Sequence, residues 1–371
     1  MSMMDKKVGV IGATGNIGRT VVSELIGNSN IRMIITCRNI SKLSKLYKPN
    51  DKLKFMKLNV NNCEELQEFA DECDIVINCS SPSSLLYNKV AKVCLENHID
   101  YIDVSGNGDL SNYLEGKRQL IEDKKLSYIL SAGIYPGFTE IYPYYVMNLF
   151  DGKIDNMTAY FSSVGELSSN AAYDFVSSFE HEYAYGMSYY KEGNIKKIDQ
   201  SKNKDSHVSN HILFSEVYPI ISQEFIKMVN NNGSLKEAYF YNAYPDKTVF
   251  NEFMIIKIMG MHKNIEEKMK CAKSIATKYS LMARKYGNLT KLYIELKGEK
   301  ENKKVLVKSS FEFDGDSNYI SAIVAYACVN AILKQKKFLG LTLPYSVIDI
   351  EDCLKKLKEK GAVINTSIEY I

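Results

Sequence analysis

Three glycines near the amino terminus are the residues whose types and spacing point most directly to chemistry. Gly12, Gly15 and Gly18 follow the apolar run at residues 8–11 and precede a segment with helical periodicity. A strand, a glycine loop and a helix in this order form a cradle for the phosphates of a dinucleotide. The alternative interpretation is a structural turn between strand and helix that binds no ligand.

Each glycine has a distinct role in such a cradle. Gly12 permits the tight turn, Gly15 lets the backbone approach the pyrophosphate, and Gly18 lets the helix pack closely on its strand. The amide groups at the start of the helix then face the phosphate charge. The same loop contributes three further candidate cofactor contacts, which are Thr14, Asn16 and Ile17.

Two basic residues follow the second apolar run, at residues 31–37, and they bear on the choice of cofactor. An NAD site places Asp or Glu about 20 residues beyond the glycine loop, to accept a hydrogen bond from the ribose 2′-hydroxyl. This chain has Arg38 and then Lys42 in that region. An arginine suits a 2′-phosphate through charge-assisted hydrogen bonds of about 1.5–3 kcal/mol each. We therefore predict NADP, with a solvated arginine after a strand as the alternative.

Small residues after two later strands complete the candidate cofactor contacts. Ser80, Ser81 and Pro82 follow the predicted strand at residues 74–79, where a loop of a doubly wound sheet borders the cofactor cleft. Small hydroxyl residues here suit hydrogen bonds to ribose and phosphate. The equally weighted alternative is that Ser81, Ser83 or Ser84 caps the helix that follows. Gly137 lies in the Pro-Gly turn after the predicted strand at residues 126–130.

Hydride transfer also requires the protein to donate or accept one proton, and three residues are candidates for that role. Tyr135 ends the sixth predicted strand beside the expected cleft, where its phenol can donate a proton or bind substrate. Packing of its ring under the Pro-Gly turn is the competing explanation. Glu166 lies between a predicted strand and helix, where capping and packing compete with chemistry. His181 is a candidate general acid because imidazole titrates near neutrality.

Two other spacings favour structural roles. Tyr113 and Lys117 have the Y-x-x-x-K spacing of short-chain reductases, but they fall on a polar segment that fits a solvated helix face. His207 and His211 stand four residues apart without the acid of an H-E-x-x-H motif. The eight cysteines show no C-x-x-C pair. We therefore predict no metal site.

Alternating strands and helices place these residues on a common scaffold. Between residues 1 and 137, short apolar runs alternate with helical segments at the spacing of a parallel sheet with right-handed crossovers. We predict an α/β fold, a Rossmann-type doubly wound parallel sheet. Helices are expected at residues 85–97 and 110–123, and the strands at residues 8–11, 31–37, 54–58, 74–79, 101–104 and 126–130.

The pattern changes after the Pro-Gly turn, and residues 138–337 are predicted to form a second, α+β domain. An antiparallel pair is expected at residues 290–296 and 304–311, and the tail is expected to form a helix at 348–360 and a short strand at 362–368. The other expected elements are strands at residues 158–164 and 253–259, and helices at 171–180, 218–229, 265–286 and 320–333.

Composition excludes several classes of protein. The 371 residues are 45% hydrophobic and 25% charged, as in ordinary soluble globular proteins, and suffice for two domains. A net charge of +3 without basic clusters argues against nucleic acid. No apolar signal region precedes the first strand, and the longest apolar stretch, residues 320–333, is too short to span a bilayer. We expect a cytoplasmic protein with no membrane partner.

Four stretches stand out by their order along the chain. They are G-A-T-G-N-I-G (12–18), D-I-V-I-N-C-S-S-P (74–82), H-I-D-Y-I-D-V-S-G (98–106) and A-G-I-Y-P-G-F (132–138). Together they resemble the saccharopine dehydrogenase-like family of NADP-dependent oxidoreductases, and the tail shows a weaker likeness at residues 338–344 and 359–364. The resemblance implies a variant Rossmann domain joined to an α+β substrate domain through which members form homodimers, with the tail at 338–371 packing back on the first domain. It also implies reduction of an imine, or oxidation of a secondary amine, between an amino acid and a carbonyl compound.

One departure from the family concerns the substrate. Many amine-forming members have an acidic residue before the Pro-Gly pair, where this chain has Tyr135, and a phenol does not pair with an ammonium group as a carboxylate does. We therefore expect an NADPH-dependent reductase of an imine-type C=N bond in a small or carrier-bound amino-acid-derived metabolite. The alternatives are a C=C (enoyl) reductase on the same fold and a non-catalytic NADP-sensing protein.

Overall fold

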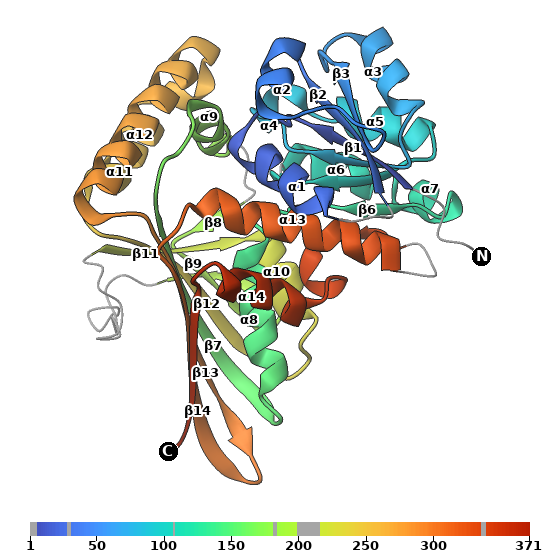
Figure 1. Cartoon of the computed structure of the whole chain (residues 1–371). Coiled ribbons are helices and arrows are strands. Elements are labelled where there is room, and N and C mark those ends of the chain that lie inside the picture. Colours follow the sequence, from blue (N-terminus) through green and yellow to red (C-terminus); the bar gives the residue numbers. More distant parts are fainter. Residues whose placement is uncertain (1–5, 28–30, 107, 181–183, 199–215, 335–338) are drawn as a thin grey trace. The chain divides into compact units, whose positions relative to one another are not determined.

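The computed structural model contains two compact units (Figure 1). One comprises Met1–Phe138 and Asn318–Lys356, and the other comprises Thr139–Ser317 and Leu357–Ile371. The structure describes residues 6–27, 31–106, 108–180, 184–198, 216–334 and 339–371. Within these ranges, no helix combines the length and the apolar character needed to cross a membrane.

The first unit is built on a seven-stranded sheet in which every pair of neighbouring strands is parallel. The strand order is β15-β6-β5-β4-β1-β2-β3, so the chain reverses its direction of travel between β1 and β4. In doubly wound sheets this switch point is where a dinucleotide binds. The strands are β1 (Lys6–Ile11), β2 (Ile31–Cys37), β3 (Leu53–Lys57), β4 (Ile75–Asn78), β5 (Asp100–Asp103), β6 (Ser127–Ile129) and β15 (Gly340–Thr342).

Apolar strands and amphipathic helices explain how this unit holds together. All four residues of β4 are buried, as expected for a strand covered on both faces. Leu66, Phe69, Cys94 and Leu114 form one core with the strands. The helices are α1 (Asn16–Ile26), α2 (Ile40–Leu46), α3 (Cys63–Ala70), α4 (Ser83–Leu86), α5 (Lys89–Glu96), α6 (Gly108–Glu115), α7 (Arg118–Asp123), α13 (Ser317–Lys334), η2 (Pro344–Ser346) and α14 (Ile350–Glu359).

A carboxylate on α1 joins the amino-terminal and carboxy-terminal parts of this unit. Glu24 accepts hydrogen bonds from Tyr319 Oη of α13 at 3.4 Å and from Lys356 Nζ of α14 at 3.0 Å. The Lys356 ammonium also lies 4.6 Å from the centroid of the Tyr326 ring, within the range of a cation–π contact. These contacts hold α13 and α14 against the helix that follows the glycine loop.

Two helices predicted as continuous are each divided in the structure. The segment at residues 85–97 contains α4 and α5, separated where Tyr87 adopts a φ of +53°. A left-handed residue cannot continue a right-handed helix, so the chain turns there. The segment at residues 110–123 contains α6 and α7, separated at Gly116 and Lys117. The Y-x-x-x-K spacing therefore does not fall on one helix.

The second unit is built on a nine-stranded mixed sheet. The central order is β10-β9-β12-β7-β13-β14-β16, with β11 pairing to β12 and to β8, and the β12–β7 pair is parallel. Antiparallel pairing of β13 with β14 confirms the predicted pair. The strands are β7 (Lys153–Val164), β8 (Ala184–Gly186), β9 (Ser188–Lys191), β10 (Asn194–Lys197), β11 (Glu216–Ser222), β12 (Glu237–Tyr244), β13 (Leu289–Lys300), β14 (Lys303–Phe313) and β16 (Val363–Tyr370).

Helices of this unit bury the apolar residues of the sheet and pack on one another. On α8, Tyr142 shares a 2.7 Å hydrogen bond with Ser309 of β14, and its ring contacts Phe311. Ala172, Ile256 and Ile275 belong to a separate core formed by α9, α11 and α12. The helices are α8 (Phe138–Leu149), α9 (Ser169–Ser177), α10 (Gln223–Asn230), α11 (Thr248–Ile258), η1 (Met261–Lys263) and α12 (Ile265–Tyr286).

Two predicted elements of the second unit were wrong. The segment at residues 253–259 was expected to be a strand and belongs to α11, because a short apolar run does not distinguish a buried strand from a buried helix. The segment at residues 218–229 was expected to be one helix, but its first part is β11. Helix α10 begins only after Ser222, whose hydroxyl accepts from Phe225 N–H at 3.0 Å.

The division into units differs from the predicted one at the carboxy-terminal end. Residues 318–337 were assigned to the second domain, but Asn318–Lys334 of α13 belong to the first unit. The whole tail was expected on the first domain, but β16 pairs with β14 in the second sheet. Only β15, η2 and most of α14 lie in the first unit. The pairing of β16 depends on a distant strand edge, which local patterns in the tail do not reveal.

Candidate cofactor-binding site

The glycine loop lies between β1 and α1, as its sequence predicts. Gly12 has a φ of +81°, a conformation that favours glycine, and its carbonyl accepts from Gly15 N–H at 2.9 Å. Gly15 is the N-cap of α1 and contributes no side-chain hydrogen bond, and the first turn of this helix contains no acidic residue. The first amide groups of a helix need partners, so this terminus suits a phosphate.

Two close approaches of backbone to backbone require glycine here. A Cβ on Gly18 would lie 2.3 Å from the carbonyl oxygen of Gly12 and 3.0 Å from Cα of Ala13. A Cβ on Gly12 would lie 2.9 Å from the carbonyl oxygen of Cys79 and 3.1 Å from Ser80 N. The glycine loop is therefore in contact with both α1 and the loop after β4, at the switch point of the sheet.

A second set of contacts ties the glycine loop to the end of β2. Ala13 N–H donates to the carbonyl of Thr36 at 3.3 Å, and the buried Thr36 hydroxyl donates to Val10 at 3.3 Å. Tyr47, after α2, donates its hydroxyl to the carbonyl of Ala13 at 3.1 Å. Burial raises the pKa of Tyr47 to about 12, so this donor stays protonated at neutral pH.

The two basic candidates, Arg38 and Lys42, lie shortly after the end of β2 in the sequence. Arg38 comes next after β2 and is exposed, and Lys42 is exposed on α2. Asn39 caps α2 by accepting from Ser41 N–H at 3.1 Å, which fixes where the helix begins. Because β2 neighbours β1, Arg38 follows a strand end adjacent to that of the glycine loop.

A buried carboxylate organises the loops after β4 and β5. Asp103 is 1% exposed and accepts from Tyr101 Oη at 2.5 Å, from Asn78 Nδ2 at 3.0 Å and from Ser105 Oγ at 2.6 Å. Asn78 Oδ1 in turn accepts from the amide and hydroxyl of Ser80. Burial, together with the nearby Asp103 carboxylate, raises the pKa of Tyr101 well above its usual value.

This network positions Ser80, one of the predicted cofactor contacts. The network itself was not predicted from the sequence. Asp103 and Asn78 end neighbouring parallel strands, and paired polar residues at two strand ends were the signal that could have identified them. Ser80 is half-buried and held by Asn78, whereas Ser81 is exposed and precedes Pro82 through a cis peptide bond. The N-cap of α4 is Pro82, which makes no side-chain capping bond.

Replacing Asp103 by asparagine tests whether this network positions the loop. We expect a loss of about 1–3 kcal/mol in the free energy of unfolding, because the amide replaces an acceptor oxygen with a donor facing other donors. The affinity for NADPH should fall several-fold, because Ser80 loses its fixed position. Urea unfolding and calorimetric titration measure the two effects. Asp51→Asn, in an exposed turn, is the matched control, and an equal effect of both changes would contradict the network's role.

The loops after β5 and β6 meet at the same edge of the sheet. A Cβ on Gly106 would lie 2.6 Å from Cγ of Pro136 and 2.7 Å from Oγ of Ser131. Gly137 has a φ of +132°, and a Cβ there would lie 2.2 Å from the Gly133 carbonyl oxygen. Tyr135 is half-buried and precedes Pro136 through a cis peptide bond. Tyr135 and Gly137 are therefore in the same unit as the glycine loop, beyond β6.

The remaining candidates are not part of this arrangement. Glu166 is exposed between β7 and α9 in the second unit. Ser168 caps α9 by accepting from Ala171 N–H at 3.1 Å. His181 lies outside the described residues, as do His207 and His211. Within the part of the chain that the structure describes, no cluster of His, Cys, Asp or Glu is suited to hold a metal ion.

Comparison with known proteins finds a family match within the first unit. Residues 8–131 match the model of the family described as saccharopine dehydrogenase NADP binding domain. The whole chain is similar to the apo structure of saccharopine dehydrogenase (L-Glu forming) from Saccharomyces cerevisiae. That similarity has a TM-score of 0.67 at 15% identity, and it covers 98% of this chain and 100% of the other. No curated protein sequence gives a significant match.

Two further similar structures each cover about a third of the chain. A Rossmann-fold NAD(P)-binding family protein from Shigella flexneri is 23% identical over 34% of this chain and 66% of its own, with a TM-score of 0.28. A short chain dehydrogenase from Burkholderia cenocepacia in complex with NADP is 14% identical. The similarity covers 35% of this chain and 72% of the dehydrogenase, with a TM-score of 0.28.

The fold class is thus confirmed, with a Rossmann-like parallel sheet and a second unit built on a mixed sheet. The glycine loop lies within the matched segment, and so do Arg38 and the Asp103 network. Residues 8–131 therefore match the saccharopine dehydrogenase NADP binding domain, and the chain as a whole has a fold similar to that of saccharopine dehydrogenase.

Proposed function

We propose that this protein is an NADPH-dependent reductase of an imine-type C=N bond in a small or carrier-bound amino-acid-derived metabolite. The observation that carries the proposal is the backbone cradle at the switch point, where Gly12 and Gly18 leave no room for side chains. A family of NADP-binding domains and the fold of an oxidoreductase both support it. The imine substrate is our inference from the resemblance to that family.

The residues present fit the cofactor. The open amide groups at the start of α1 suit the pyrophosphate, with Thr14, Asn16 and Ile17 in the loop and first turn around them. Arg38 and Lys42 would hold the 2′-phosphate and so favour NADPH over NADH. Ser80, Ser81 and Pro82 would border the ribose, and Gly137 would leave room beside the nicotinamide. When bound, the cofactor supplies the hydride.

The chain's own residues would orient the substrate and transfer one proton. Tyr135 is half-buried in the turn between β6 and α8, and a phenol can hydrogen-bond the substrate nitrogen or donate the proton to it. Glu166 and His181 are the other candidates for the proton.

The function is tested by cofactor oxidation. Purified full-length protein is mixed with NADPH and a panel of cyclic imines, of amine–aldehyde pairs and of enones, and the absorbance of NADPH is followed. We expect consumption with C=N substrates and an amine product identified by mass spectrometry. Consumption with enones alone would assign a C=C reductase. Tight NADPH binding without turnover across the panel would favour a sensor of the cofactor.

Tyr135→Phe tests the role of the phenol. We expect kcat to fall about tenfold, since one hydrogen bond to the reacting group is lost, while the Kd for NADPH stays within about twofold. Stopped-flow turnover and calorimetry measure the two quantities. Tyr113→Phe on α6 is the control and should leave both unchanged. An unchanged kcat in the Tyr135 variant would assign the ring to packing.

Homodimer formation is a further part of the proposal, taken from the resemblance to the family. Sedimentation velocity at micromolar concentration tests it directly. We expect a species of about twice the 42.1 kDa chain mass. A single species with the mass of one chain would contradict this part and would leave the proposed reaction intact.

A further inference from the structure

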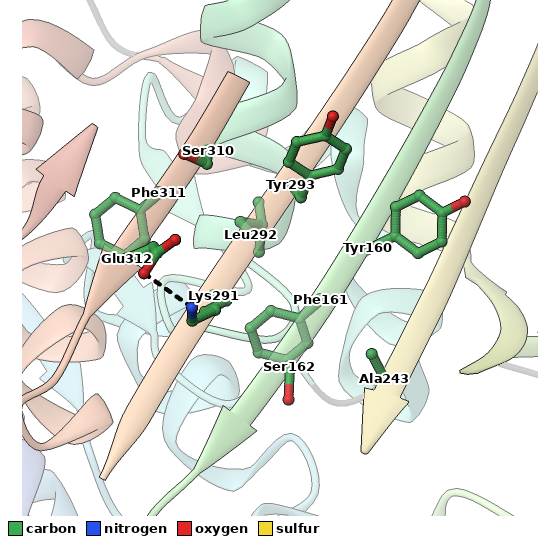
Figure 2. A pocket seen from close by; sticks show the side chains of 10 residues that line it. All are labelled: Tyr160, Phe161, Ser162, Ala243, Lys291, Leu292, Tyr293, Ser310, Phe311 and Glu312. Carbon is green, nitrogen blue, oxygen red and sulfur yellow. Dashed lines mark ion pairs between the residues drawn. The ribbon is translucent and has the colours of Figure 1, made fainter. Parts of the chain in front are cut away.

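A cavity of about 150 Å³ lies on the sheet of the second unit (Figure 2). Its lining residues come from β7, β12, β13 and β14, all within Thr139–Ser317. Ser162, Lys291 and Glu312 occupy directly paired positions on β7, β13 and β14, so their side chains share one face of the sheet. Tyr160 and Tyr293 pair in the adjacent row of the same face. Nothing in the proposed cofactor site accounts for this cavity.

An unsatisfied hydroxyl in this row indicates a polar ligand. Ser162 is 3% exposed, and its Oγ has no hydrogen-bond partner among the described residues. Burying a hydroxyl without a partner is costly, so such groups normally meet water or a ligand. A hydroxyl can both donate and accept a hydrogen bond, so Ser162 by itself does not select the charge of the ligand. That selection depends on the charged side chains next to Ser162.

The neighbouring charges are balanced. Lys291 Nζ lies 2.9 Å from Glu312 Oε2, and the two side chains are 17% and 41% exposed. Figure 2 shows this ion pair across β13 and β14. An ammonium group has three N–H donors and a carboxylate has two oxygens, so each partner can bind a further group without breaking the pair. A ligand of one charge would be attracted by one partner and repelled by the other.

We infer that this cavity binds a small zwitterion of the α-amino-acid type. Its carboxylate accepts from Lys291 and Ser162, its ammonium group donates to Glu312, and its short side chain lies against the rings of Tyr160 and Tyr293. The volume suits about six non-hydrogen atoms, since a cavity of this size accommodates benzene. L-alanine has that size. The inference goes beyond the proposed reductase activity and requires no bound cofactor.

The test is calorimetric titration of the full chain with L-alanine in the absence of NADPH. We expect binding at one site per chain, with an affinity at least about tenfold higher than for acetate, methylammonium or glycerol, because only the zwitterion pairs with both charges. Equal affinities for L-alanine and glycerol would overturn the zwitterion assignment. The absence of L-alanine binding, or a crystal soaked in L-alanine with only water in the cavity, would overturn the site.

Substitutions locate the binding. Lys291→Met and Glu312→Gln should each weaken L-alanine binding about tenfold. Ser162→Val should abolish binding, because it removes the hydroxyl and places a methyl group where the ligand carboxylate would lie. Circular dichroism checks that each variant folds. If the valine variant does not fold, Ser162→Ala removes the hydroxyl alone and should weaken binding several-fold.

The matched control lies on the same face of the sheet. Lys308 and Glu369 form an ion pair of 3.0 Å between β14 and β16, with side chains 27% and 47% exposed, and neither residue lines the cavity. Lys308→Met should leave L-alanine binding unchanged. An equal loss in the Lys308 and Lys291 variants would show a general effect of surface charge and would overturn the inference.

Discussion

Replacing Gly18 by alanine is expected to weaken NADPH binding about a hundredfold and to lower the free energy of unfolding by about 1–3 kcal/mol. The added Cβ would lie 2.3 Å from the Gly12 carbonyl oxygen, and that atom belongs to backbone that cannot rotate away. Helix α1 must therefore move off the loop. The loss of two charge-assisted amide–phosphate bonds accounts for the change in affinity. Calorimetric titration and urea unfolding measure the two effects.

A glycine at the other end of the same helix is the matched control. Gly27 is the C-cap of α1 with a φ of −71°, and a Cβ there would have no atom of the described residues within 4 Å. Gly27→Ala should leave NADPH affinity unchanged and stability the same or higher by up to about 1 kcal/mol, because it restricts the unfolded chain. Wild-type affinity in a folded Gly18→Ala variant would exclude this loop as the phosphate site.

Replacing Arg38 by alanine is expected to weaken NADPH about 10- to 100-fold and NADH less than about threefold. The two cofactors differ only in the 2′-phosphate, so a residue that binds this group changes the ratio of the two affinities. Arg38 follows β2 at the edge where the glycine loop follows β1, next to the expected position of the adenosine ribose. Titration of each variant with both cofactors at one fixed salt concentration measures the ratio.

Arg32 on the same strand provides the control for overall charge. It is exposed near the start of β2, so Arg32→Ala removes the same charge from the opposite end of the strand. We expect this change to leave the ratio of NADPH to NADH affinity unaltered. If Arg38→Ala weakens both cofactors equally, Arg38 has no part in binding the 2′-phosphate, and Lys42→Ala would be examined next.

Local sequence was sufficient where neighbouring residues alone set the structure. The strand, glycine loop and helix at residues 8–26 are contiguous, so their order and spacing predicted the cradle and the α/β class. Prediction from the sequence was less reliable where a short apolar run is compatible with either a buried strand or a buried helix. The run at residues 253–259 is helical because α11 packs on α9 and α12, and these contacts are remote in sequence. The choice of ligand, and the roles of Arg38 and Tyr135, stay predictions.

Only the tertiary structure decided which strand ends meet. Asp103 and Asn78 become one buried network because β5 pairs with β4, and the loop around Gly106 reaches Pro136 because β6 neighbours β5. Likewise, β16 joins the second sheet through the free edge of β14, and the row from Ser162 to Glu312 exists only in the register of three strands. The periodicity of apolar residues in the sequence indicates which face of a helix or strand is buried. The order and register of strands in a sheet depend on the packing of the whole chain.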